Sequence, residues 1–149
     1  MDFRNYRVKS PVKSFRDLEV YQKTIQLSDE ITSLSFLGKD QFEDDNKEIK
    51  SIAEKIPKLI AEAYGDKFDS KEIAHKKLTE AVTLITNAVT KIDLFRERFR
   101  EDKSSKEILD NLLTRYQTQK IKVLNLRKAW NRVFTNYPQN EPGKADWRK

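Results

Sequence analysis

The sequence lacks several features, and each absence narrows what the chain can be. It has no cysteine, so disulfide bonds and cysteine-ligated metal sites are excluded. Only three of its 149 residues are glycine and four are proline, too few for the frequent turns of a β-sandwich. No apolar run approaches the ~20 residues of a membrane span, and the stretch MDFRNYRVKSPVKS lacks the apolar block of a signal peptide. We therefore expect a cytoplasmic protein with no membrane partner.

Groups that carry catalysis are also scarce. The single histidine, His75, stands on a charged stretch, where a surface role is far more common than that of a base or ligand. Glu72 precedes it at the Glu-x-x-His spacing of bundle metal centres, but a two-metal site needs two such pairs. No HExxH motif, glycine-rich phosphate loop or nucleophile elbow is present. We expect a non-enzymatic chain with no catalytic residue, metal, cofactor or small-molecule substrate.

Positive charge is concentrated at the two ends of the chain. Residues 1–16 carry five basic side chains and one acidic one, and residues 111–149 carry nine and two. The net charge is therefore +4 at the first end and +7 at the second, which leaves −5 of the total of +6 for residues 17–110. Such asymmetry is typical of a polyanion-binding surface, but it also suits self-assembly of basic ends on acidic flanks.

Apolar residues repeat at steps of three and four in four segments, which predicts four amphipathic helices. The first begins at Ser14, which forms a candidate capping box with Asp17. The second spans about residues 44–64, with Gly65 as its expected C′ residue. The third follows the candidate N-cap Ser70, and the fourth starts near residue 104 and ends at Pro138. The apolar rows are Val20, Thr24, Leu27, Ile31 and Leu34; Ile49, Ile52, Ala53, Ile56, Ile60 and Ala63; Ala74, Leu78, Ala81, Ile85, Ala88, Ile92, Phe95 and Phe99; and Leu109, Leu112, Tyr116, Val123, Leu126, Trp130 and Val133.

Four helices of this length with short connections predict an all-α fold, an antiparallel up-down-up-down four-helix bundle. Its heptad-like period indicates left-handed packing. We place the bundle at residues 14–137, between a flexible basic arm at residues 1–13 and a flexible basic tail at residues 138–149.

Two groups of apolar residues fall outside these rows. Leu18, Tyr21 and Ile25 add a second apolar face to the first helix, and Ile121 and Leu124 lie off the row of the fourth. They fit a wide core stripe or scattered exposed residues, which are common. They fit a subunit interface about equally well.

Two motifs resemble a known family. The stretch FRDLEVYQKTIQLSDEI, residues 15–31, is similar to the F-x-D-L-x-V-W-Q-K-A opening of the bacterial four-helix-bundle protein family of the ribosomal RNA intervening-sequence type. The stretch KIPKLIAEAYG, residues 55–65, resembles its S-I-P-x-N-I-A-E-G-Y-G motif, although Leu59 and Ala63 replace the usual Asn and Gly. The resemblance covers residues 15 to roughly 100 in order and spacing. The matching residues are Phe15, Asp17, Leu18, Val20, Gln22, Lys23, Ile56, Pro57, Ile60, Ala61, Glu62, Tyr64 and Gly65.

Pro57 lies well inside the second predicted helix. A proline there leaves the carbonyl of Ala53 without its donor and bends the helix. The structural interpretation is that the bend lets this helix follow the curvature of the bundle. The functional interpretation is that the exposed carbonyl side of the helix and Glu62 help to form a contact site.

The resemblance implies partners as well as a fold. Related proteins include the accessory variability proteins of diversity-generating retroelements, which are pentameric and bind a reverse transcriptase and its template RNA through positive surfaces. By this resemblance we expect a homo-oligomer, a homopentamer, that binds RNA or DNA and a reverse transcriptase. The alternative is a protein–protein interaction or scaffold module of the intervening-sequence family, without a nucleic-acid role.

Candidate nucleic-acid-binding residues come from both basic ends. Phe3 and Tyr6 alternate with the arginines of the arm and offer rings for stacking on bases. No RNA-recognition motif is present, so we expect contacts to the backbone with little readout of bases. The cations are spread around the fourth helix, which also fits an ordinary solvated face. The candidates are Arg115, Lys122, Arg127, Lys128 and Arg132 on the fourth helix and Arg4, Arg7, Lys9 and Lys13 in the arm.

Overall fold

The computed structural model describes residues 14–34 and 43–139, with side chains as far as residue 132. A short 3-10 helix, η1 (Phe15–Asp17), precedes four α-helices. These are α2 (Glu19–Thr32), α3 (Glu43–Asp66), α4 (Lys71–Arg98) and α5 (Lys103–Gln139). No strand occurs within the described ranges, and the predicted all-α four-helix fold is confirmed.

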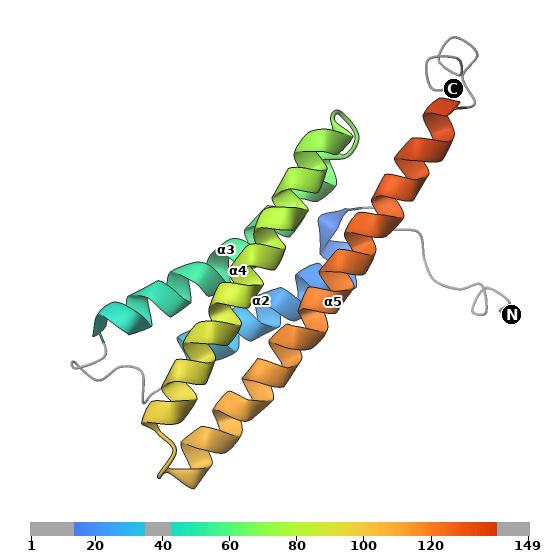
Figure 1. The fold of residues 1–149 in the computed structure, drawn as a ribbon. Helices are drawn as coiled ribbons and strands as arrows, with labels where there is room; N and C mark the ends of the chain where they lie inside the picture. Colours follow the sequence, from blue (N-terminus) through green and yellow to red (C-terminus); the bar gives the residue numbers. More distant parts are fainter. Residues whose placement is uncertain (1–13, 35–42, 140–149) are drawn as a thin grey trace, which may run out of the picture.

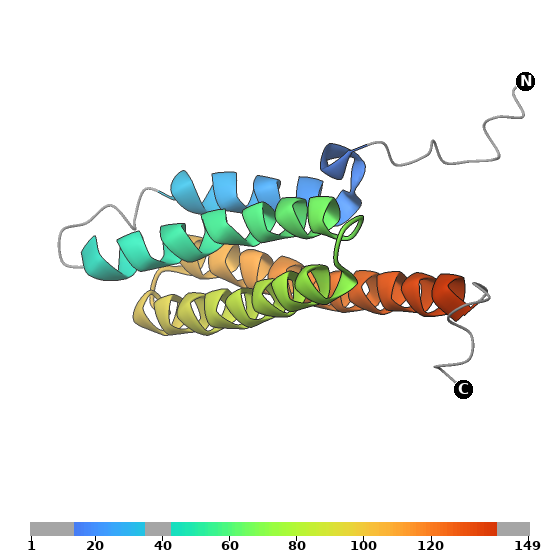
Figure 2. The same ribbon diagram turned by 90° about the horizontal axis from the view of Figure 1, so that it is seen from above.

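The four long helices form an antiparallel up-down-up-down bundle (Figure 1). Each helix packs on the next one in the chain, and α5 closes the ring by packing on α2. Seen from above, α2 and α3 form one layer over α4 and α5 (Figure 2). The last turns of α5 extend past the beginning of α4 and past the turn between α3 and α4 (Figure 2). Among the described residues, no helix is long and apolar enough to cross a membrane.

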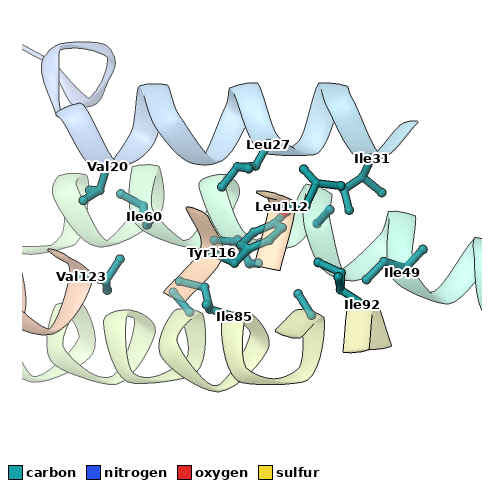
Figure 3. Packing of buried hydrophobic residues seen from close by; sticks show 14 of the residues in the cluster. Val20, Leu27, Ile31, Ile49, Ile60, Ile85, Ile92, Leu112, Tyr116 and Val123 are labelled. Carbon is teal, nitrogen blue, oxygen red and sulfur yellow. The ribbon is translucent and has the colours of Figure 1, made fainter. Parts of the chain in front are cut away.

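The core is built from the predicted apolar rows. Seven of the eight residues expected on α4 are buried, and only Phe99 at the end of the row is half-buried. Each large aliphatic side chain that is fully withdrawn from water contributes about 1.5–3 kcal/mol before entropic costs. Tyr116 of α5 lies in the middle of this core among Leu112, Ile85 and Leu27 (Figure 3). Alanines 74, 81 and 88 on α4 keep its backbone close to its neighbours.

The ends of the helices follow local signals in two places. Ser70 caps α4, because its hydroxyl accepts a hydrogen bond from the backbone N–H of Ile73 at 3.2 Å. The Ser14–Asp17 capping box is also present, with a 3.3 Å hydrogen bond from the Ser14 backbone N–H to the Asp17 carboxylate. It caps η1, however, and α2 begins only after Leu18, whose extended backbone separates the two helices.

Two predicted boundaries were wrong. The helix α3 runs through Gly65 to Asp66, and Gly65 lacks the left-handed backbone of a C′ residue. The turn is made instead at residues 66–70, where the Ser70 N–H donates to the carbonyl of Asp66 at 2.7 Å. At the other end of the bundle, α5 ends at Gln139, one residue past Pro138. The predicted arm at residues 1–13 and most of the predicted tail lie outside the described residues.

The proline of the second motif occupies a packed position. Pro57 lies inside α3, and the chain is helical on both sides of it. Like Ile56 and Ile60 of the same helix, Pro57 is buried. The ring therefore belongs to the packed side of α3. This burial favours the structural interpretation of the proline over an exposed contact site.

Candidate nucleic-acid interface

The cations predicted on α5 separate onto two sides of that helix. Arg115 and Lys122 are seven residues apart and therefore share one side, the side that faces α2. Arg115 forms two hydrogen bonds with the carboxylate of Glu30, at 2.7 and 2.5 Å, and a third with Asn111. Lys122 lies 3.9 Å from a carboxylate oxygen of Glu19. These two cations thus already face acidic groups of α2.

The pair formed by Glu30 and Arg115 makes stability depend on pH. Its hydrogen bonds lower the pKa of Glu30 below the ordinary value of 4.5 and raise that of Arg115. The contribution is therefore complete above that ordinary value and disappears as pH falls through the lower pKa of the folded state. Since both side chains are about one-third exposed or more, we expect only about 0.5–1 kcal/mol. Glu30→Gln should be less stable than wild type by this amount at neutral pH, and the difference in melting temperature should close as the pH falls below the ordinary pKa of 4.5 and through the lowered pKa of Glu30.

A gap that persists unchanged at acidic pH would contradict this role of the Glu30 carboxylate. Asp29→Asn is the matched control, because Asp29 is the exposed neighbouring carboxylate on α2. Its melting temperature should follow that of wild type throughout the titration.

Arg127 and Lys128 lie on another side of α5, where a groove separates this helix from the first turns of α4. Three adjoining hollows form this α4/α5 groove, and all three share His75 and Asn131. The two larger ones have volumes of about 510 and 450 Å³. The groove is lined by Lys71, Glu72, Ile73, Ala74, His75, Lys76, Leu78, Ile121, Leu124, Asn125, Arg127, Lys128, Trp130 and Asn131.

A short relay of hydrogen bonds holds Arg127 against α4. Its guanidinium donates to the hydroxyl of Thr79 at 2.8 Å. That hydroxyl in turn donates to the backbone carbonyl of His75 at 2.9 Å. Since a guanidinium carries five N–H donors, Arg127 keeps several for an incoming anion. The relay therefore holds the charge of Arg127 at the groove and leaves other N–H donors of its guanidinium for phosphate.

The groove has more positive than negative charge. Four lysine and arginine side chains line it, against the single carboxylate of Glu72. Among the described residues, Lys71, Lys76 and Lys128 make no ion pair. Some cations elsewhere on the bundle do, as Lys91 pairs with Glu48 at 2.7 Å, whereas others, such as Lys55 and Lys58, also make no ion pair with a described residue. The groove thus contains cations that no other described residue neutralises.

An aromatic platform adjoins the α4/α5 groove through Trp130, which lines one of its hollows. It consists of Tyr64 and Phe68, at the turn between α3 and α4, and Trp130 of α5. The Tyr64 ring centroid lies 5.5 Å from that of Phe68 and 6.4 Å from that of Trp130. The Lys67 ammonium lies over all three rings, at 4.9, 3.9 and 5.5 Å from the centroids of Tyr64, Phe68 and Trp130. Partial burial lowers the pKa of Lys67.

The residues of the first motif, at η1 and the start of α2, have structural roles. Phe15 packs edge-on against Tyr21, with their ring centroids 4.9 Å apart. Asp17 completes the capping box, and Leu18 is buried in the core. Gln22 donates to the backbone carbonyl of Arg16 at 2.8 Å, which ties η1 to α2. This motif therefore encodes the corner between η1 and α2.

The motif on α3 is used in the same way. Ile56 and Ile60 are fully buried, and Ala61 is half-buried beside them. Glu62 lies 3.4 Å from Lys77 of α4, which also pairs with Asp66 at 2.8 Å. With Tyr64 in the aromatic platform, the motif joins the end of α3 to α4 and α5.

Sequence reasoning found only part of this surface. Lys71 and Lys76 were missed, because they stand on a helix whose charge was counted with the acidic middle of the chain. Lys71, His75 and Thr79 do recur every four residues, a signal of one polar helix face. Arg132 is exposed on α5 but does not line the groove. The arm candidates Arg4, Arg7, Lys9 and Lys13, with Phe3 and Tyr6, lie outside the described residues.

Comparisons with known proteins add no relative to this picture. No family model, curated protein or solved structure matches the chain. Within the described part of the chain, no group of three or more potential metal-ligating side chains occurs. No third described side chain joins Glu72 and His75 as a potential ligand, and both line the groove.

Proposed function

We propose that this protein is a non-catalytic helical-bundle accessory protein that binds the phosphate backbone of nucleic acid. The observation that carries the proposal is the α4/α5 groove, in which Lys71, Lys76 and Lys128 remain unpaired with other described residues beside a positioned Arg127. Two amide side chains, Asn125 and Asn131, line the same groove and add neutral hydrogen-bonding groups to its wall. Phosphate contacts of this kind supply affinity and register but little sequence readout.

The resemblance of the two motifs to the four-helix-bundle family extends this proposal. It favours a reverse transcriptase ribonucleoprotein of the diversity-generating retroelement type as the setting, and a homopentamer as the assembly. Five copies of a chain with a net charge of +6 would concentrate positive potential around one particle. Neither the partner nor the pentamer follows from the groove itself, and both stand on the motifs alone.

A second candidate function has an observation in its favour. Ile121 is 59% exposed and Ile73 is 47% exposed, and both line the α4/α5 groove. Apolar side chains in a hollow are typical of a protein–protein interface. In this alternative, the groove receives a partner protein and the cations fix its orientation.

Binding should depend steeply on salt if phosphates occupy the groove. Four phosphate contacts, one for each lining cation, predict that affinity falls by about fifty- to 150-fold between ~50 and ~200 mM salt. Fluorescence anisotropy of labelled RNA and DNA 20-mers, titrated with the protein at both salt concentrations, measures this slope. Weak binding that ignores salt would contradict the phosphate contacts.

Absence of any binding at the lower salt concentration would favour the second candidate. Light scattering of the free protein provides the companion measurement, because it reports the oligomer mass. A particle of five chains would support the assembly that the motifs suggest. A monomer would contradict the pentamer but would leave the proposed phosphate binding in the groove unaffected.

A further inference from the structure

We propose that the aromatic platform stacks with an unpaired base, so that the α4/α5 groove prefers single-stranded over double-stranded nucleic acid. This inference deepens the proposed function and depends on it. The platform is formed by Phe68, Trp130 and Tyr64 around Lys67. Stacking on an aromatic ring requires a base whose face is free, and the faces of duplex bases are covered by their neighbours.

The position of Trp130 joins the platform to the phosphate-binding surface. Its side chain lines the central hollow of the groove together with Arg127 and Lys71. A nucleic-acid strand whose phosphates lie along the groove therefore also passes the aromatic rings. Single-strand binding proteins combine these two elements, a cationic groove that follows the backbone and aromatic rings that receive the bases.

The exposure of Phe68 is the second observation. It is the most exposed of the large apolar side chains on the described surface, at 68%. An aromatic ring that is mostly in water contributes little burial to the fold, whereas Ala63 of α3 and Ala74 of α4 nearby are buried. Lys67 lies 3.9 Å above the centroid of the ring and covers one of its faces, so we assign the base to the opposite face, with a cation close by. A nucleotide at the platform thus meets a ring for its base and an ammonium for its phosphate.

The test compares a labelled dT 20-mer with a duplex of the same length at ~50 mM salt. We expect wild type to bind the single strand more tightly, and Phe68→Ala to weaken single-strand binding roughly tenfold while leaving duplex binding unchanged. Phe68→Leu is the matched control, because it keeps an apolar side chain but has no ring. It should bind the single strand as weakly as Phe68→Ala does.

A second readout follows the ring itself. The two tryptophans of the chain are Trp130 and Trp147, so a Trp147→Phe background isolates the fluorescence of Trp130. Titration with the dT 20-mer should quench Trp130, and titration with the duplex should not. Melting temperatures establish that each variant is folded at the temperature of the titration.

The outcomes separate this inference from the function beneath it. Equal affinity for single strand and duplex, or a Phe68→Leu variant that binds like wild type, would overturn the stacking platform and leave the cationic groove in place. Failure of wild type to bind either form at ~50 mM salt would overturn the proposed function and the platform together.

Discussion

A protein that carries both Lys71→Glu and Lys128→Glu is expected to bind an RNA 20-mer about a hundredfold more weakly than wild type at ~50 mM salt. Lys71 begins α4 and Lys128 lies on α5, so the two changes act on opposite walls of the groove. Each reversal removes an attraction to phosphate and adds a repulsion of similar size, about 0.7 kcal/mol for charges ~6 Å apart in water, so the two reversals together cost about 2.8 kcal/mol. Fluorescence anisotropy under the conditions used for wild type gives the ratio.

The matched control separates a local surface from overall charge. Lys55 and Lys58 are exposed on α3 and line no hollow of the α4/α5 groove. Lys55→Glu with Lys58→Glu lowers the formal net charge from +6 to +2, as the groove variant does. We expect its affinity to fall less than fivefold, because distant exposed charges are largely screened. Equal losses in both double variants would mean that total charge, and no particular groove, governs binding.

The bundle was predictable because its information is periodic and local. The row from Ala74 to Phe95 specifies one apolar stripe on one helix, and every member of that row is buried. Ser14 and Ser70 cap helices through bonds to residues two or three positions away, so the signal and its effect lie together in the sequence. The prediction that Gly65 ends the second helix was wrong, because glycine permits a left-handed C-cap without requiring one.

The groove was less predictable, because it depends on which helix faces meet. Arg127 and Lys128 belong to the same predicted helix as Arg115 and Lys122. No local feature of the sequence distinguishes the two pairs. The division arises from the third dimension: Glu30, 85 residues before Arg115, binds its guanidinium, whereas Thr79 on another helix holds Arg127. Only the packed bundle shows that one side of α5 meets carboxylates and the other meets further cations.

The aromatic platform illustrates the same limit for apolar residues. Trp130 was counted as a core residue by its heptad position, and it is half-buried against the core. Trp130 also contacts Tyr64 of α3 and Lys67, which follows α3. These contacts depend on how far α5 continues past the α3–α4 turn. Heptad position predicts which side of a helix a residue lies on. It does not predict which residues from the end of another helix pack against that side.

Tyr116 supplies the second large effect, a pair of substitutions with opposite consequences for stability. Its ring is fully buried at the centre of the core, and burial raises the pKa of its hydroxyl, which stays protonated. Tyr116→Ala removes the ring and leaves a cavity, so we expect the free energy of unfolding to fall by about 3–5 kcal/mol. Urea denaturation followed by helical circular dichroism measures the change.

Tyr116→Phe tests the hydroxyl alone. Among the described residues, the Tyr116 hydroxyl has no hydrogen-bond partner, and a buried polar group without a partner costs about 1–3 kcal/mol. Replacing it with a hydrogen atom keeps the ring and removes that cost, so Tyr116→Phe should be as stable as wild type or more stable. A loss above about 1 kcal/mol would mean that the hydroxyl is satisfied in solution. Since the ring does not line the α4/α5 groove, Tyr116→Phe should bind RNA like wild type, and thus separates the stability of the bundle from its surface charge.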